Sequence, residues 1–267
     1  MKQNFSAEHK KYLNKLKTQT ALTHIARILL LALIVGLWEL MASSGLVDPF
    51  ITSSPSRIIS KLTEMFSSGS IWQHISVTLY ETLLAFLIST ILGSLVAILL
   101  FMCLPLKRIL EPYLVVLNSL PKIALGPLII IWMGVGTSAI VTMGVLICIV
   151  ITTISMLNGF LEIENEKIML LKSMGANKFQ ILFKLILPAS LPNFISVLKI
   201  NVGMAWVGVI MGEYLSSKAG LGYLLVYGGQ VFQLDLVMTT IVLLCVLAGL
   251  MYMIIALLEM YVNKKRK

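Results

Sequence analysis

The residues of this chain that could do chemistry are charged side chains set inside long apolar stretches. Lys199, Trp206 and Glu213 are spaced by seven, so on a helix they share one face. Gly203 and Ile210 complete that stripe. Lys199 and Glu213 would lie about 21 Å apart along the helix axis, too far apart to pair with each other. We therefore expect this face to meet a translocation pathway or a partner subunit; the alternative is that Lys199 anchors one end of the helix and Glu213 lies at the opposite rim.

A second charge of this kind is Lys122, which lies between Pro121 and Pro127 in an apolar run over about residues 112–133. Proline in a membrane-spanning helix frees backbone carbonyls, which must be buried in protein or face a watery cavity. A charge at such a place usually faces a bundle interior or a pathway. We expect Lys122 and the two prolines to border the pathway; the alternative is that Lys122 extends toward the membrane interface.

The sequence lacks the motifs for ATP binding and for catalysis. The sequence contains no Gly-x-x-x-x-Gly-Lys-Ser/Thr phosphate loop, no Gly-x-Ser-x-Gly and no His-Glu-x-x-His. The three histidines, His9, His24 and His74, have no metal-ligand spacing, and the three cysteines lie far apart in or beside apolar runs. We expect no catalytic residue, no metal and no cofactor, so any ATP would be bound by another chain.

Composition places the elements that hold these residues in a bilayer. The chain has 267 residues, of which 58% are hydrophobic and 12% are charged, whereas soluble domains carry about a quarter charged residues. The chain cannot cover itself with polar surface and is therefore an integral membrane protein. Its net charge of +9 comes from basic residues at the two ends and in short loops, which argues against nucleic acid as a partner.

Apolar runs long enough to cross a bilayer predict an all-α, polytopic fold with about six transmembrane helices. They cover about residues 25–46, 75–104, 112–133, 139–160, 193–214 and 236–262. We expect polar tails at 1–24 and 263–267, a membrane domain over 25–262, and a short re-entrant or interfacial turn at 221–226. In the second span, small residues at four-residue spacing favour packing within the chain over a dimer seam; they are Ala85, Ser89, Gly93 and Ala97.

The distribution of positive charge sets the topology. Lysines and arginines gather at both ends, at Lys107–Arg108 and in the interval 162–192, whereas the other side has only Arg57, Lys61 and Lys218. Loops rich in lysine and arginine stay in the cytoplasm. Both termini and the interval 162–192 are therefore expected in the cytoplasm.

That interval is the longest polar stretch after the amino-terminal tail. Acidic residues come first and basic residues follow, with Gly175 in the middle, where one helix can stop and another can start. Pro188 and Pro192 can each sit in the first turn of a following helix. We expect two short surface helices hinged at Gly175; an ordinary loop with helical turns is the alternative.

The interval also carries a resemblance. The order Gly175, nine residues, Leu185, one residue, Leu187–Pro188 resembles the cytoplasmic signature loop of binding-protein-dependent ABC importer permeases. That signature opens with Glu-Ala-Ala, whereas this chain has Met-Leu-Leu at 169–171. The stretches 120–136 and 205–225 are similar to the branch that imports nitrate, taurine, aliphatic sulfonates and some vitamin precursors.

The resemblance implies a type I ABC importer permease fold with a cytoplasmic coupling-helix loop at 162–188. It implies a pore of two copies of this chain, two ATP-binding cassette subunits beneath it, and an extracytoplasmic binding protein at the loops 47–74 and 216–234. The solute would be a small organic or inorganic anion or a vitamin precursor. The coupling residues would be Glu166, Ile168, Met169, Leu171, Met174, Gly175, Ala176, Phe179, Leu187 and Pro188.

Two other functions remain open from the residues. An ion-gradient-driven secondary transporter could use Lys122, Lys199 and Glu213 as its coupling relay, with the broken third span as its site. A scaffold subunit that couples ATPases to a separate integral substrate-binding protein would also need a surface loop.

Overall fold

The structure, a computed structural model, describes residues 7–266, and these contain helices and no strand. The chain divides between Thr63 and Glu64 into two compact units. Five helices are long and apolar enough to cross a membrane, and a bent helix pair can supply a sixth span. The all-α, polytopic fold expected from the sequence is confirmed.

The first unit holds α1 (Ala7–Ser43), α2 (Pro49–Thr52) and the start of α3 (Pro55–Ser67). The apolar part of α1, Thr18–Ser43, is the first candidate span. The helix begins at Ala7, so it includes most of the expected amino-terminal tail, of which residues 1–6 lie outside the described part. Glu39 accepts hydrogen bonds from the backbone N–H of Ser56 at 3.0 Å and from its hydroxyl at 2.8 Å. These bonds tie the end of α1 to the start of α3.

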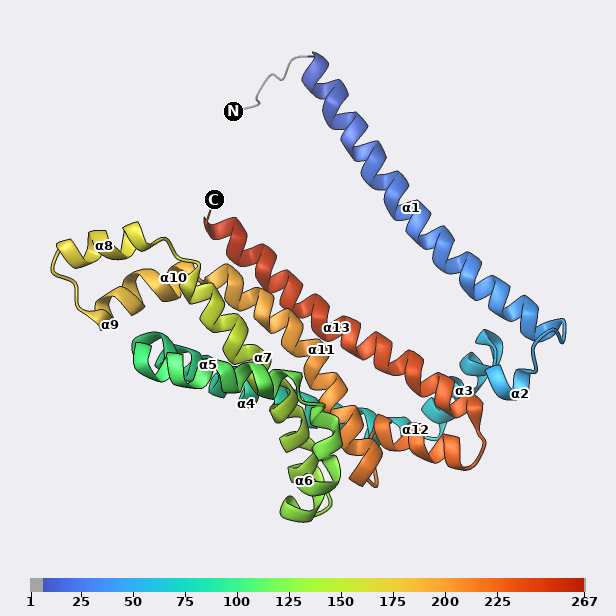
Figure 1. The fold of residues 1–267 in the computed structure, drawn as a ribbon. Helices are drawn as coiled ribbons and strands as arrows, with labels where there is room; N and C mark the ends of the chain where they lie inside the picture. Colours follow the sequence, from blue (N-terminus) through green and yellow to red (C-terminus); the bar gives the residue numbers. More distant parts are fainter. Residues whose placement is uncertain (1–6, 267) are drawn as a thin grey trace. The chain divides into compact units, whose positions relative to one another are not determined.

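The second unit is a helical bundle (Figure 1). Its long helices are α4 (Ser70–Met102), α5 (Leu104–Ser119), α7 (Thr137–Leu161), α11 (Leu191–Ser216) and α13 (Leu234–Arg266). Its short elements are η1 (Lys122–Leu125), α6 (Gly126–Met133), α8 (Asn165–Ser173), α9 (Lys178–Ile181), the π-helical turn η2 (Leu182–Ile186), α10 (Leu187–Ala189) and α12 (Leu221–Gln230). The α8–α9 region, the α4–α5 turn and the carboxyl-terminal end of α13 lie at one end of this bundle, and α6 and α12 lie toward the other.

Small residues allow α4, α7 and α11 to pack closely. A Cβ on Gly208 of α11 would lie 2.6 Å from the Cα of Gly144 on α7, and a Cβ on Gly93 of α4 would lie 2.7 Å from the Cβ of Thr152 on α7. Within the second span, Gly93 and the other members of its small-residue stripe are buried. The stripe therefore packs within the chain, as expected.

A polar network also crosses these three helices. The buried side chain of Asn201 on α11 donates to the hydroxyl of Thr90 on α4 at 3.0 Å and to that of Thr152 on α7 at 2.8 Å. Such bonds between transmembrane helices fix their rotation as well as their spacing.

The third span differs from the expectation in its start. The expected spans 75–104 and 112–133 leave Lys107 and Arg108 in a loop between them, whereas the chain turns at Cys103 and both residues lie in α5. Pro112 lies inside that helix, while Leu104–Ser119 and Lys122–Met133 meet at 86°. The expected break at Pro121 is confirmed, because this proline cannot continue the hydrogen-bond ladder.

Candidate functional site

The segment between α7 and α11 forms an elbow, which we define as residues 162–190. Its first helix, α8, ends in a left-handed residue, Gly175, with φ of 81°. The N–H of Gly175 donates to the carbonyl of Lys172, and the N–H of Ala176 donates to that of Leu171, both at 2.9 Å. This is the Schellman arrangement, in which a left-handed glycine lets two helix-end carbonyls find partners. The expected helix stop at Gly175 is confirmed.

The second helix of the elbow starts with a capping box. The side chain of Asn177 accepts from the N–H of Gln180 at 2.8 Å, and the side chain of Gln180 accepts from the N–H of Asn177 at 2.8 Å. The bend between the helices is therefore hydrogen-bonded on both sides. Sequence reasoning missed these two residues, although an N-cap residue followed three positions later by glutamine is a recognisable helix start.

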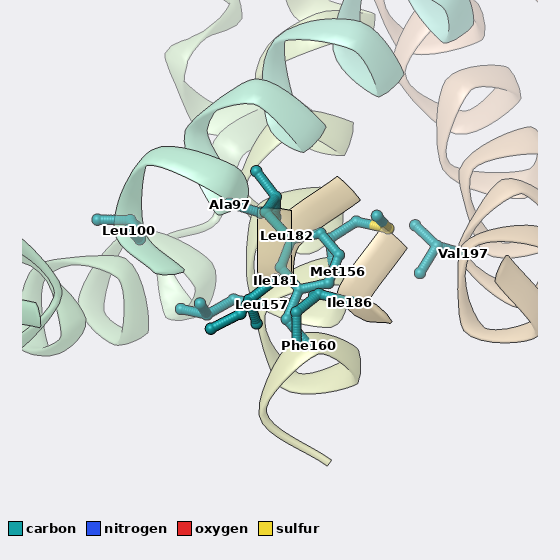
Figure 2. Close-up of a cluster of buried hydrophobic side chains, with 9 residues drawn as sticks. All are labelled: Ala97, Leu100, Met156, Leu157, Phe160, Ile181, Leu182, Ile186 and Val197. Carbon is teal, nitrogen blue, oxygen red and sulfur yellow. The ribbon is translucent and has the colours of Figure 1, made fainter. Parts of the chain in front are cut away.

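The inner side of the elbow packs on a hydrophobic cluster at the ends of three spans. Figure 2 shows its nine buried members, contributed by α4, α7, α9, η2 and α11: Ala97, Leu100, Met156, Leu157, Phe160, Ile181, Leu182, Ile186 and Val197. Four of the expected coupling residues pack against this cluster from its edge: Ile168, Leu171, Ala176 and Leu187. The elbow is thus anchored to α4, α7 and α11 together.

The outer side of the elbow carries large apolar side chains with little cover. Five of them are between 62% and 74% exposed: Met169, Leu170, Met174, Phe179 and Phe183. Leu170 and Phe183 were not among the expected docking residues, whereas Ile168 and Leu171 of that set face inward. Ile168 and Leu171 are three positions apart and therefore lie on one face of α8, whereas Met169 and Leu170 between them lie on the other. An exposed apolar surface of this kind is typical of an interaction site.

The path from the elbow to α11 is helical but irregular. The N–H of Leu187 donates to the carbonyl of Leu182, five residues back, which makes the π-helical turn η2. Pro188 and Pro192 lie in the first turns of α10 and α11, as expected. A proline lacks the N–H that would continue an α-helical ladder, and π turns commonly absorb such interruptions. Glu166, also expected at this site, lies exposed in the first turn of α8.

Lys199 has a partner that sequence reasoning missed. Its ammonium group pairs with the carboxylate of Glu259 on α13 and lies 5.9 Å from the ring centroid of Tyr252. The pair joins two spans that are 60 residues apart in sequence. No local pattern predicts such a pair, because it depends on how α11 and α13 are rotated against each other.

Glu213 joins α11 to α4 and α12. It is 1% exposed, and its two carboxylate oxygens accept from the hydroxyl of Thr78 and from the N–H of Gly222, each at 2.6 Å. Thr78 in turn accepts from the N–H of Leu221 at 2.7 Å, and His74 accepts from that of Gly220 at 3.0 Å. The start of α12 is therefore fixed by side chains of α4 and α11.

Trp206, the third member of the stripe, is 3% exposed, and its indole N–H has no hydrogen-bond partner among the described residues. Trp206 and Glu213 are thus buried within a single chain rather than on its surface. A pathway or partner role for their face stays a prediction.

Lys122 is half-buried, and its ammonium group donates to the carbonyl of Asn118 at 3.1 Å. That carbonyl belongs to the last turn of α5, where the chain breaks at Pro121 and no helical N–H follows. A cation is favourable at a helix carboxyl end. Pro127 lies in the first turn of α6 rather than at a second break. A pathway role for these three residues also stays a prediction.

Comparison with known proteins shows similarity to permeases of ABC transporters. Residues 89–267 match the family described as "Binding-protein-dependent transport system inner membrane component". A probable ABC transporter permease of Haemophilus influenzae is 30% identical over 84% of this chain and 91% of its own length. The taurine transport system permease of Escherichia coli is 26% identical over 83% of this chain and 82% of its own length.

A solved structure supports the fold. One chain of the inward-facing MetNI methionine ABC transporter superposes with a TM-score of 0.63. The match covers 73% of this chain and 98% of that one, at 23% sequence identity. At this identity the likeness concerns the arrangement of helices alone, and it agrees with a type I importer permease fold.

Proposed function

The chain belongs to the family of binding-protein-dependent transport system inner membrane components, and on this premise we propose that it forms the translocation pathway of an ATP-driven importer. As an ABC transporter permease it is a multi-pass membrane protein. Its partners would be two ATP-binding cassette subunits, a second copy of the chain and an extracytoplasmic solute-binding protein. ATP would be hydrolysed on the cassette subunits.

The elbow is the observation that carries the proposal. It combines an exposed apolar outer side with an inner side anchored to α4, α7 and α11. A subunit that grips the outer side can therefore move three spans at once. The two helices of the elbow are held at a fixed angle by the Schellman motif and the capping box, so displacement is transmitted rather than absorbed in a loose loop.

The charge distribution supports an orientation of the bundle in the membrane. The elbow lies at the same end of the bundle as the carboxyl-terminal end of α13 and the α4–α5 turn (Figure 1). Most basic loop residues of the second unit belong to this end, which we therefore assign to the cytoplasm, with both chain termini. The loops 47–74 and 216–234 would face the binding protein on the other side.

The proposed class of solute is inferred from the names of related permeases. Their names mention aliphatic sulfonates, taurine, formylaminopyrimidine and riboflavin. We propose a small anion of the sulfonate type or a vitamin precursor. The ion-gradient alternative gains no support, because Lys199 is paired with Glu259 and both oxygens of Glu213 are already hydrogen-bonded.

Copurification of the cassette subunit tests the proposal. Met174→Glu places a charge on the outer side of the elbow, where no packing inside the chain is lost, and should abolish copurification of an ATP-binding subunit. Phe232→Glu is the matched control, since Phe232 is 69% exposed in the turn between α12 and α13, away from the elbow. Retention of the ATP-binding subunit by Met174→Glu, at wild-type membrane levels, would contradict the proposal.

A further inference from the structure

A cavity of about 400 Å³ lies at the end of the bundle opposite the elbow. Its walls are the first half of α4, the start of α7 with the turn before it, and the end of α11 with the segment 217–219 that follows. Two charged side chains line it, Glu81 and Lys218. Neither has a role in the coupling elbow.

Glu81 has an oxygen without a partner. The residue is 1% exposed, and its Oε2 atom accepts no hydrogen bond within residues 7–266. Thr137, at the start of α7, lines the same cavity beside it. A buried carboxyl oxygen without a donor is unfavourable and rare. The cavity beside Glu81 is where a donor from outside the chain can reach it.

The neighbouring carboxyl group explains why the protein does not supply that donor itself. Thr78 lies one turn before Glu81 on α4, but its hydroxyl donates to Glu213, and the N–H of Gly222 is also committed to Glu213. The carboxylate of Glu81 therefore lies beside the cavity with no hydrogen-bond donor from residues 7–266 on its Oε2 atom.

The rim of the cavity has the opposite charge. Lys218 is exposed, and its ammonium group forms no ion pair or hydrogen bond with any described residue. A negative group at the floor and a positive group at the rim match a molecule that carries both charges. A metal ion fits less well, because it needs several oxygen ligands and no group of three His, Cys, Asp or Glu gathers among the described residues.

We propose that this cavity binds a small zwitterionic solute, with its protonated amine on Glu81 and its anionic end toward Lys218. The cavity volume lies within the range of small-molecule sites. The inference rests on the proposed function in one respect, namely that this end of the bundle faces the arriving solute. It narrows the solute class to molecules with an amino group, such as an aminoalkyl sulfonate or an amino acid.

Equilibrium binding to the purified full chain in lipid nanodiscs tests the inference without any partner subunit. The probes are radiolabelled 2-aminoethanesulfonate and glycine, with ethanesulfonate and ethylamine as competitors that each carry only one of the two charges. We expect saturable binding of at least one zwitterion, and at least about tenfold weaker competition by either single-charge compound.

Two substitutions and two controls locate the site. Glu81→Gln removes the charge but keeps the size of the side chain, and it should weaken binding by about tenfold or more. Lys218→Gln should weaken binding several-fold. Glu111→Gln on α5 and Lys184→Gln in the elbow remove the same charges away from the cavity and should leave binding unchanged. If Glu81→Gln does not fold, Lys218→Gln and the competitor series still decide.

Three results would overturn the inference: no saturable binding of either zwitterion, equal competition by ethanesulfonate, or wild-type binding by both Glu81→Gln and Lys218→Gln. None of these results would contradict the proposed function, because copurification of the ATP-binding subunit depends on the elbow and does not need a solute site in this chain.

Discussion

Gly175→Leu should uncouple ATP hydrolysis from uptake, and the structure sets the size of the effect. A Cβ on Gly175 would meet no atom within 4 Å, so the substitution causes no steric clash there. The penalty comes from the backbone, because φ is 81° and a left-handed conformation costs a residue with a side chain about 1–2 kcal/mol. Relief of that strain requires loss of the two Schellman hydrogen bonds, which together contribute about 1–3 kcal/mol.

These two costs are similar, so the elbow of the variant would be divided between its native bend and an opened form. A shift of about 1–2 kcal/mol changes the ratio of the two forms by a factor of about 5–30. An opened elbow still offers apolar side chains to the cassette subunit but no longer transmits displacement to the cluster in Figure 2. With the two forms of the variant at similar free energy, about half of the hydrolysis events would move no solute, so we expect the number of ATP molecules hydrolysed per solute to rise by about twofold.

The assay is paired measurement of ATPase rate and solute uptake in proteoliposomes that contain the permease, its cassette subunit and its binding protein. Gly45→Leu is the matched control, because Gly45 has φ of 74°, a Cβ added to it would meet no atom within 4 Å, and it lies between α1 and α2, outside the elbow. Gly175→Asn is a second control, since asparagine tolerates the left-handed conformation. Unchanged coupling in Gly175→Leu, or equal loss in Gly45→Leu, would refute the reasoning.

Three further outcomes follow from the packing. Gly208→Ala should destabilise the bundle by about 1–3 kcal/mol, because the added Cβ would clash with the backbone of α7, and the measurement is a lower Tm in detergent. Gly203→Ala is the control: it lies on the same helix, its Cβ would meet nothing within 4 Å, and its Tm should not fall. Lys199→Met and Glu259→Gln should each lower Tm, because each leaves the other residue without its partner. The Tm decrease of the double variant should be smaller than the sum of the two single decreases. Additive decreases in Tm would argue against the ion pair. Asn177→Ala should cost the start of α9 about 1 kcal/mol and speed amide hydrogen exchange there without changing exchange in α7; unchanged exchange in α9 would contradict the capping box.

The sequence by itself determined the features that depend on local chemistry. Long apolar runs require helices in a bilayer because each backbone group must find its partner within the segment, so the spans were predictable. The stop at Gly175 and the positions of Pro188 and Pro192 followed from the backbone preferences of those residue types. The asymmetric placement of lysine and arginine predicts which side of the membrane holds the elbow, and that assignment remains a proposal.

Only the tertiary structure decided which side chains meet. Spans that are apolar all round carry no hydrophobic stripe that reports their rotation. The pairing of Lys199 with Glu259 and the hydrogen bond from Thr78 to Glu213 could therefore not be predicted from spacing. The same applies to the elbow, where Ile168 turns inward and Leu170 outward although both are apolar. Contacts between segments far apart in the chain are set by how closely and at what rotation the helices pack, and that information is shared among many residues rather than held in any one motif.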